Sequence, residues 1–262
     1  MLKTVLAHPL TRGKDIDDSD TTGLRREIIA SKPFLRRLYA DWYSRIAAAL
    51  PDVTGAVVEL GSGAGFAREF VPEVIRSEVF ACPEIDVVAD GRQLPFGSRS
   101  LRAILMTDVF HHIPDAERFL REAERCLVEG GRIIMWEPWV TPWSRLVYGR
   151  LHHEPFEPSA LSWGFPASGP LSGANVALPW IVFDRDRERL QREHPKLRLL
   201  AIHPAMPIRY LLSGGVSLRS LVPGWSYSAI AGLESLCTPW MRQLAMFAFI
   251  VVEKSVCRSR EG

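Results

Sequence analysis

One stretch of the sequence decides the fold: Val57-Val58-Glu59-Leu60-Gly61-Ser62-Gly63-Ala64-Gly65-Phe66. Residues 56–60 form a short, mostly apolar run with β-branched side chains, which is typical of a strand buried on both faces. Three glycines follow at alternate positions, and glycine lets the backbone turn with positive φ and approach a ligand closely. Residues 66–71 then have a short helical pattern that Pro72 ends. Strand, glycine turn and helix together predict the first unit of a nucleotide-binding α/β sheet.

The spacing of the glycines distinguishes between ligands. A dinucleotide fingerprint reads Gly-x-Gly-x-x-Gly, whereas the third glycine here, Gly65, comes one residue early. Glu59 also places a carboxylate beside the turn, where it would repel a pyrophosphate. The turn therefore favours a cationic ligand without phosphate. A glycine turn that binds no ligand is the alternative.

This stretch resembles motif I of the class I S-adenosylmethionine-dependent methyltransferases. In that family an acid-Leu-Gly-x-Gly-x-Gly turn wraps the amino-acid part of the cofactor. The resemblance assigns cofactor binding to Glu59, Gly61, Ser62, Gly63 and Gly65. It implies S-adenosyl-L-methionine as the cofactor and methyl transfer as the activity.

A second segment, residues 90–96, resembles the Asp-Ala-x-x-Leu-Pro-Phe sequence that follows the third strand of small-molecule methyltransferases. In that family the aspartate accepts a hydrogen bond from the adenine amino group, and the next backbone amide meets the ring. The resemblance therefore assigns these roles to Asp90 and Gly91. A carboxylate suits the task because an exocyclic amine needs an acceptor.

The ribose of the cofactor needs a carboxylate that accepts hydrogen bonds from two neighbouring hydroxyls. The family usually places this acid at the end of the second strand, which we predict over residues 74–79. Glu78 is the candidate, with Glu84 as the second choice. A third strand at residues 87–89 leaves about seven residues for the connection, too few for a crossover helix. We therefore expect the usual helix between these strands to be missing.

The fourth strand is predicted over residues 101–106, and polar side chains follow it directly. These are Thr107, Asp108, His111 and His112. The run resembles the family's fourth-strand motif, which places Thr107 and Asp108 on the cofactor side. Ligands of such sheets lie outside the carboxyl ends of the strands, where the strand order reverses. We therefore expect the two histidines at the acceptor, although a packed or cofactor-side histidine is the alternative for either one.

These segments predict an α/β fold in one domain over residues 1–262. The expected architecture is Rossmann-like and doubly wound, with a mostly parallel seven-stranded sheet, an antiparallel last strand, and helical or loop cap insertions. Residues 1–50 would form an N-terminal arm and helices, 52–137 the cofactor-binding core, and 138–196 and 204–240 the caps. Within these parts we expect helices at residues 21–29, 32–50, 115–129, 143–152 and 184–194, a loop at 159–183, and strands at 132–136, 197–202 and 244–252.

The charge, the cysteines and the apolar stretches of the chain indicate which binding partners and which cellular compartment to expect. The net charge of +2 gives no reason to expect nucleic acid. The four cysteines are scattered without a Cys-x-x-Cys pair, which argues against a metal site or disulfides and suits the cytoplasm. No signal peptide is evident at the polar N-terminus. The apolar stretch 211–236 is interrupted by glycines, a proline and an arginine, so we expect peripheral contact with a membrane rather than a span. The oligomeric state is left open.

The acceptor is expected to be a small apolar or aromatic molecule that is methylated on oxygen. Removing the hydroxyl proton suits a neutral histidine, and the candidates are His112, His111 and the cluster 152–154. The His-His-Glu run 152–154 could bind a metal, but we expect none, because adjacent histidines in an extended segment rarely point the same way and no further ligand set is apparent. Seven tryptophans lie from Trp136 onward, either as a wall around the acceptor or as a core of the insertions. Alternative functions are an inactive binding protein and, less favoured, a nicotinamide oxidoreductase.

Overall fold

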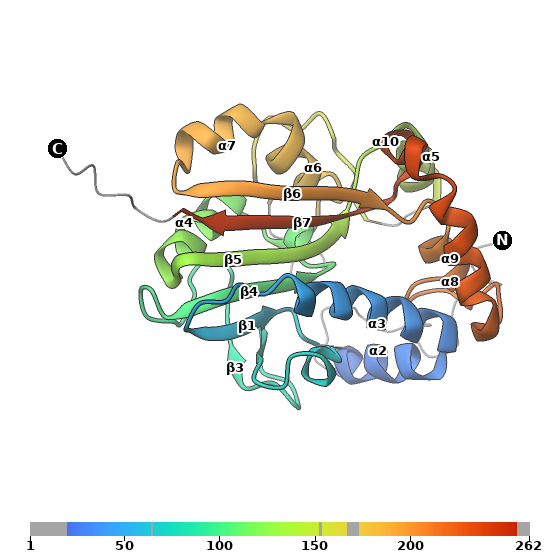
Figure 1. The fold of residues 1–262 in the computed structure, drawn as a ribbon, viewed down its shortest axis with the longest axis horizontal. Helices are drawn as coiled ribbons and strands as arrows, with labels where there is room; N and C mark the ends of the chain where they lie inside the picture. The colour runs from blue at the N-terminus through green and yellow to red at the C-terminus, as the bar shows by residue number, and fades with distance from the viewer. Residues whose placement is uncertain (1–19, 64, 152–153, 167–172, 256–262) are drawn as a thin grey trace.

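The computed structural model describes residues 20–63, 65–151, 154–166 and 173–255. Its centre is a seven-stranded sheet with the strand order β3-β2-β1-β4-β5-β7-β6 (Figure 1). The strands are β1 Ala56–Leu60, β2 Ile75–Glu78, β3 Val87–Val88, β4 Leu101–Thr107, β5 Leu127–Pro138, β6 Leu197–Ala205 and β7 Phe247–Lys254. The order reverses between β1 and β4, as expected for a doubly wound sheet.

The direction of the strands confirms the predicted fold class. β1 pairs with β2 and with β4 in parallel, and β5 continues the parallel ladder beyond β4. The last strand, β7, runs antiparallel between β5 and β6. The structure is thus a mostly parallel Rossmann-like sheet with an antiparallel last strand.

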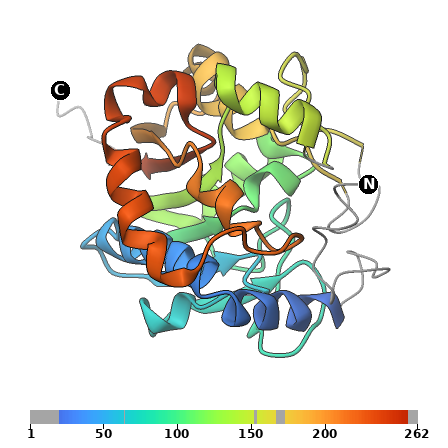
Figure 2. The same cartoon turned by 90° about the vertical axis from the view of Figure 1, so that its right-hand side faces the viewer.

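Neighbouring residues of the central strands point to opposite faces, and helices cover both faces. On one face Val58, Ile104 and Ile133 belong to the core that includes α4. On the other face Val57 and Ala103 pack in the core that includes α3. The helices are α2 Asp20–Ser31, α3 Pro33–Ala48, α4 Ala116–Cys126, α5 Pro142–Leu151, α6 Leu178–Trp180, α7 Arg187–Glu193, α8 Arg209–Ser213, α9 Tyr227–Ser235 and α10 Met241–Leu244. Figure 2 shows α2 along one edge and α9 along another side.

The helix predicted over residues 66–71 is wrong. Only the single 3-10 turn η2 Ala67–Glu69 follows the glycine loop, and Pro72 comes soon after it. Phe66 and Val71 are instead buried in the same core as α3, with the Arg36 guanidinium 4.0 Å from the centre of the Phe66 ring. Packing against α3 has replaced the helix. As predicted, the connection from β2 to β3 contains no helix either.

The predicted end of α4 is also wrong, because the helix stops at Cys126 rather than at the two glycines that follow. β5 begins directly, and its pairing with β4 skips from Leu127 opposite Leu101 to Arg132 opposite Ala103. Gly130 has a φ of +77° in the residues that bulge out between these pairs. The glycines therefore serve a bulge in the strand and not a helix terminus.

The loop predicted over residues 159–183 is wrong at its end. α6 and the π-helical segment η4 Ile181–Arg185 form there, and Val182 and Phe183 are fully buried. The last part of this uncharged run, from Ala177 to Phe183, packs in the core that includes α4. The charged helix α7 consequently starts at Arg187, and β7 starts at Phe247 after the short helix α10. Helices α2, α3 and α5 lie close to their predicted positions.

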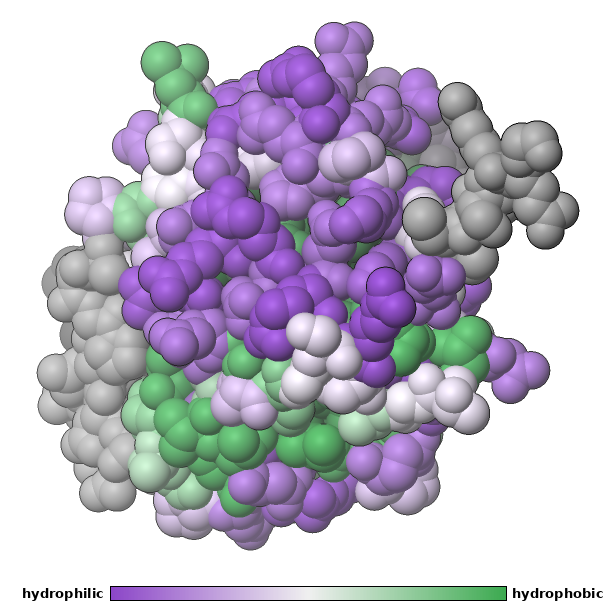
Figure 3. Space-filling model, turned by 90° about the vertical axis from the view of Figure 1, so that its left-hand side faces the viewer, coloured by the Kyte–Doolittle hydropathy of each residue, from purple (hydrophilic) through white to green (hydrophobic). Residues whose placement is uncertain are grey.

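The surface is mixed in character. The face that includes α4 and the end of β7 is mainly hydrophilic in its upper part, with an apolar area below (Figure 3). Among the described residues, no helix combines the length and the apolar character that crossing a membrane requires.

Candidate functional site

The glycine loop after β1 is shaped by two contacts that leave no room for side chains. Gly61 has a φ of +67°, and a Cβ there would lie 2.5 Å from the Cγ2 atom of Val109. A Cβ on Gly65 would overlap the carbonyl oxygen of Ser62, which accepts a hydrogen bond from the Gly65 amide. Val109 belongs to the loop after β4. The two loops that the sequence singled out therefore touch at Gly61.

Glu59 lies buried beneath this loop, with 1% of its surface exposed. The Tyr43 hydroxyl donates to its Oε1 at 2.8 Å, while Oε2 has no hydrogen-bond partner among the described residues. Burial raises the pKa of Glu59 to about 7, and the hydrogen bond from Tyr43 offsets part of this rise. A buried carboxylate oxygen without a partner is costly, so this position favours a bound cation.

The two ribose candidates differ clearly in position. Glu78 is buried at the end of β2, and its Oε1 accepts a hydrogen bond from the Gly63 amide at 2.8 Å. Burial raises its pKa. Glu84 is exposed, has a φ of +68° and forms ion pairs with Arg26 and Arg76. Only Glu78 lies beside the glycine loop.

Asp90 follows β3 in a tight turn. The Arg92 guanidinium binds both of its carboxylate oxygens, at distances from 2.7 to 3.1 Å, and this hydrogen bonding lowers the pKa of Asp90. At Gly91 a Cβ would lie 3.2 Å from Ile113, which follows the histidines in the β4–α4 loop. The predicted adenine segment thus adjoins that loop. Both oxygens of the Asp90 carboxylate therefore accept hydrogen bonds from Arg92 in this structure.

At the end of β4 the backbone wraps around a carboxylate of β5. Glu137 is fully buried, and the amides of Val109, Phe110 and His111 point to its oxygens, with the nearest at 2.7 Å. Asp108 enables this turn with a φ of +63°, and its own amide donates to the Trp136 carbonyl. Thr107 ends β4 opposite Trp136. Glu137 fixes the geometry of the whole loop.

His111 lies among three carboxylates. Its Nδ1 is 2.8 Å from Glu137, and its Nε2 is 3.5 Å from Glu154 and 4.0 Å from Asp108. Burial disfavours a charged ring, but the hydrogen bonds to Glu137 and Glu154 and the charge of Asp108 raise the pKa of His111 well above its ordinary value. Burial also raises the pKa of Asp108 to about 7. These contacts therefore favour the charged form of the His111 ring.

His112 differs from its neighbour. Its Nδ1 lies 3.0 Å from the Gly173 carbonyl oxygen, and its Nε2 lies 3.9 Å from Glu154. Burial and the charge of His111 lower the pKa of His112 to about 4. The ring is thus neutral at physiological pH. It can accept a proton, although only as a weak base.

The insertion after β5 is fastened to the β4–α4 loop by backbone hydrogen bonds. The Asn175 amide donates to the His111 carbonyl at 2.9 Å, and the Ala116 amide donates to the Trp163 carbonyl at 2.9 Å. The rings of Tyr148 and Phe156, 5.6 Å apart, come from the same insertion as Glu154. The end of β4 is thus covered by residues distant in sequence.

The tryptophans mostly serve the cores. Trp136 stacks on Trp42, and Trp163 is buried with its Nε1 donating to Asp186. Trp225 and Trp240, by contrast, are exposed over most of their surface. Within the described residues these side chains therefore do not form one wall around an acceptor.

The structure brings most of the predicted site residues together. Glu59, Gly61, Gly63, Gly65 and Glu78 surround one loop, Asp108 and both histidines lie on the next, and Val109 and Ile113 connect these parts. Within the cluster 152–154, only Glu154 belongs to the described residues. The sequence analysis missed Tyr43 and Glu137. Glu137 lies at the carboxyl end of β5, at the same edge of the sheet as Asp108, and that position could have identified it.

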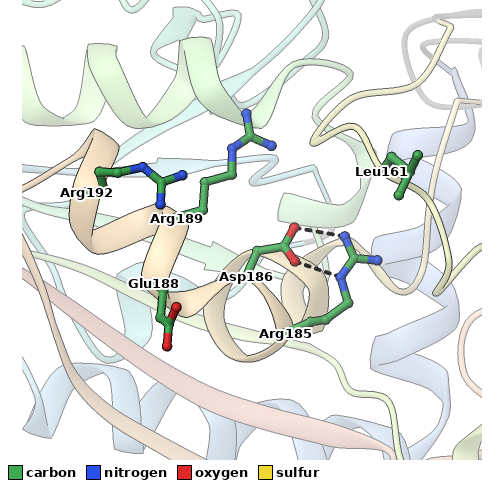
Figure 4. A pocket seen from close by; sticks show the side chains of 6 residues that line it. All are labelled: Leu161, Arg185, Asp186, Glu188, Arg189 and Arg192. Carbon is green, nitrogen blue, oxygen red and sulfur yellow. Dashed lines mark hydrogen bonds and ion pairs between the residues drawn. The ribbon is translucent and has the colours of Figure 1, made fainter.

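A surface pocket of about 520 Å³ lies away from these residues, at η4 and α7 (Figure 4). The Arg185–Asp186 ion pair occupies its centre, and Arg189 and Arg192 extend along one side. None of the predicted site residues lines this pocket. Its chemistry is that of a charged, solvated helix surface.

Comparison with known proteins agrees with this geometry. Residues 66–135 match the family described as "Methyltransferase domain". No curated protein sequence matches the chain. Residues 66–135 therefore resemble a methyltransferase domain, in agreement with the resemblance found in the sequence.

Solved structures share the fold at low sequence identity. A chain in the complex between the Haloferax volcanii Trm112 methyltransferase activator and a protein described as a methyltransferase has 14% identity and a TM-score of 0.51. The alignment covers 93% of this chain and 100% of that one. An S-adenosylmethionine-dependent methyltransferase from Thermotoga maritima, described as a possible histamine N-methyltransferase, has 17% identity and a TM-score of 0.50. That alignment covers 83% of this chain and 89% of the other.

Proposed function

We propose that the protein transfers the methyl group of S-adenosylmethionine to an oxygen atom of a small apolar or aromatic acceptor. The observation that carries this proposal is the buried, unpartnered Oε2 of Glu59 beneath a glycine loop that touches the end of β4. The cofactor is a cation with an α-amino group, so a buried carboxylate gains a partner when it binds. Cofactor and acceptor would then meet between Gly61 and the histidines.

The residues present fit the cofactor. The glycine loop would hold its amino-acid part over Glu59, and Glu78 would accept the ribose hydroxyls in place of the Gly63 amide. Asp90 would accept from the adenine amino group while it keeps one bond to Arg92. When bound, the cofactor supplies an electrophilic methyl carbon and a neutral thioether as the leaving group. The chain itself contributes alignment and exclusion of water.

On the acceptor side the residues of interest are His111 and His112. His112 is neutral, so its Nε2 can accept the hydroxyl proton, whereas the pKa of His111 keeps that ring charged until a ligand changes its surroundings. Asp108, with a pKa of about 7, is a second proton acceptor in reach of the same space. The rings of Tyr148 and Phe156 support an apolar or aromatic acceptor.

We also propose a location for the protein. Free thiols at Cys82, Cys126 and Cys237 suit the cytoplasm. The segment from η5 Gly224–Ser226 through α9 to η6 Thr238–Trp240 exposes Trp225, Leu233, Leu236 and Trp240. This apolar surface supports peripheral membrane contact, which would give access to acceptors that partition into lipid.

The central test is calorimetry with S-adenosylmethionine and its demethylated product. The wild type should bind both, and Glu78→Gln should weaken binding by ~1–3 kcal/mol, the scale of an unmade buried hydrogen bond. Glu84→Gln is the matched control and should bind like the wild type. No binding by the wild type would reject the proposed function.

A turnover test separates an enzyme from a binding protein. Labelled methyl transfer onto fractions of small molecules from a lysate should identify the acceptor. Cofactor binding without any transfer would favour the inactive binding protein, and tighter binding of a nicotinamide dinucleotide would favour the oxidoreductase.

A further inference from the structure

Three side chains at the end of β4 converge on one point. One ring nitrogen from each of His111 and His112 and one carboxylate oxygen of Glu154 all lie within 4.8 Å of one another. We propose that these residues bind a divalent metal ion, which takes the acceptor oxygen as a further ligand. The role given to the acceptor rests on the proposed methyltransferase function, whereas metal binding itself does not.

The two adjacent histidines can point to the same side because they do not lie in an extended segment. Neighbouring side chains in an extended segment point to opposite sides, but His111 and His112 end the 3-10 turn η3 Phe110–His112. Their ring centres lie 4.2 Å apart, with 41° between the ring planes. Both Nε2 atoms consequently approach the same carboxylate, at 3.5 Å and 3.9 Å. The expectation of no metal concerned the adjacent histidines of the cluster 152–154 and not this pair.

The Nδ1 atom of each histidine is held by a hydrogen-bond partner. His111 Nδ1 lies 2.8 Å from the Glu137 carboxylate, and His112 Nδ1 lies 3.0 Å from the Gly173 carbonyl oxygen. Metal-binding histidines typically make such a bond with the nitrogen that does not bind the metal, because it sets the tautomer and the orientation of the ring. Glu137 is itself held by backbone amides. The support for two metal ligands is therefore already built.

The charges around the point also favour a cation. Asp108 Oδ1 lies 4.0 Å from His111 Nε2, so Asp108, Glu137 and Glu154 surround the two rings. In the part of the chain that the structure describes, neither Asp108 nor Glu137 forms an ion pair with an arginine or a lysine. A dication would partly balance the negative charge of these carboxylates.

The ligand set restricts the metal and its role. Two imidazoles and a carboxylate suit zinc, iron(II), cobalt or manganese. Three protein ligands leave positions open for an exogenous ligand. His112 Nε2 cannot act as the base while it binds the metal, so an acceptor hydroxyl bound to the ion would release its proton to solvent instead. Its oxygen would bond to the methyl carbon while the carbon–sulfur pair leaves with sulfur, giving the methyl ether and the neutral thioether.

The test uses the metal alone. Full-length protein is stripped with a chelator and titrated with Co²⁺, followed by its visible absorption and by metal analysis after dialysis. We expect one tightly bound ion per chain. His112→Gln and Glu154→Gln should each weaken binding at least ~10-fold. His203→Gln and Glu157→Gln, which change an exposed histidine and an exposed glutamate elsewhere, should bind like the wild type.

Circular dichroism of each variant confirms that it is folded before the affinities are compared. Less than one ion per wild-type chain, or equal losses in the control variants, would overturn the metal site. Cofactor binding is measured on the same stripped samples. Intact cofactor binding without metal binding would remove only this inference, while metal binding without cofactor binding would remove the proposed function.

Discussion

At the scale of single residues, the site holds two carboxyl groups whose negative charge is disfavoured when no ligand is bound. Glu59 and Asp108 both have a pKa of about 7, and in each case burial is the main cause. Glu59 lies under the glycine loop, and Asp108 lies on the loop that touches it. Burial therefore favours the protonated form of each side chain. A cationic ligand would favour the charged form of both.

The raised pKa of Glu59 predicts a pH dependence of stability. Between pH 4.5 and 7 the folded protein keeps a proton that the unfolded chain releases, so the free energy of unfolding should fall as pH rises through this window. The size of the effect is up to ~3 kcal/mol for this group. Urea denaturation across the window should show a smaller decline for Glu59→Gln. The same decline in wild type and variant would contradict the assignment.

Glu59 should also make the affinity for the cofactor depend on pH. The affinity should rise with pH, whereas the free energy of unfolding should fall. Binding of S-adenosylmethionine should strengthen as pH rises toward and above 7, because the carboxylate form of Glu59 then needs no deprotonation. Calorimetry of Glu59→Gln should show weaker binding and a flatter pH profile. Glu27→Gln, an exposed change on α2, is the control and should keep the wild-type profile.

Gly61 is the glycine at which a side chain should do most harm. Its φ of +67° and the contact with Val109 mean that Gly61→Ala should destabilise the protein by ~1–3 kcal/mol and weaken cofactor binding. Gly232→Ala in α9 is the matched control, because nothing lies within 4 Å of its added Cβ. That change should stabilise the helix by up to ~1 kcal/mol. Thermal unfolding with and without cofactor measures both.

At the scale of elements, the candidate site is built on short irregular turns, where a doubly wound sheet often has a full helix. η2 replaces the helix after the glycine loop, and η3 directs two adjacent histidines to one carboxylate. The regular helices α3 and α4 instead provide the two cores against which these turns are held. The candidate site residues thus lie on short turns, while the regular helices provide the cores.

The element that we expect to meet a membrane is the segment η5–α9–η6. Replacing Trp225 and Leu236 together by serine should reduce co-sedimentation with phospholipid vesicles, because both side chains are exposed, at 82% and 69%. Leu161→Ser is the control, since Leu161 is 91% exposed on another part of the surface. Absence of wild-type binding to vesicles, or an equal loss in the control, would exclude this surface as the contact.

At the scale of the whole molecule, the strands were the most predictable part. Each buried strand is a short apolar run, and its position follows from local sequence, as in residues 56–60 and 101–107. The helix after the loop was not predictable in this way. Phe66 and Val71 have helical spacing, but they are bound into the core of α3, which lies earlier in the chain. The conformation of residues 66–71 therefore depends on tertiary packing and not on local sequence alone.

The site residues can likewise be separated into those that local sequence predicts and those that depend on tertiary contacts. The glycine loop, Glu78 and the histidines follow from motifs at the ends of strands, and the structure places them together. Glu154 could not be placed, because its approach to His111 depends on an insertion that returns to the β4–α4 loop. Contacts between distant segments leave no periodic signal in the sequence.

The three-residue turn η2 has an electrical consequence. A dinucleotide fold normally directs the amino end of a full helix at the pyrophosphate, and aligned peptide dipoles give that end a partial positive charge of roughly half a unit. η2 has too few peptides for such a macrodipole, and Glu59 adds an acid where the pyrophosphate would lie. We therefore expect the loop to discriminate between cofactors by electric field rather than by size. It should favour a zwitterionic sulfonium, because a phosphate chain of similar width would meet no positive pole there.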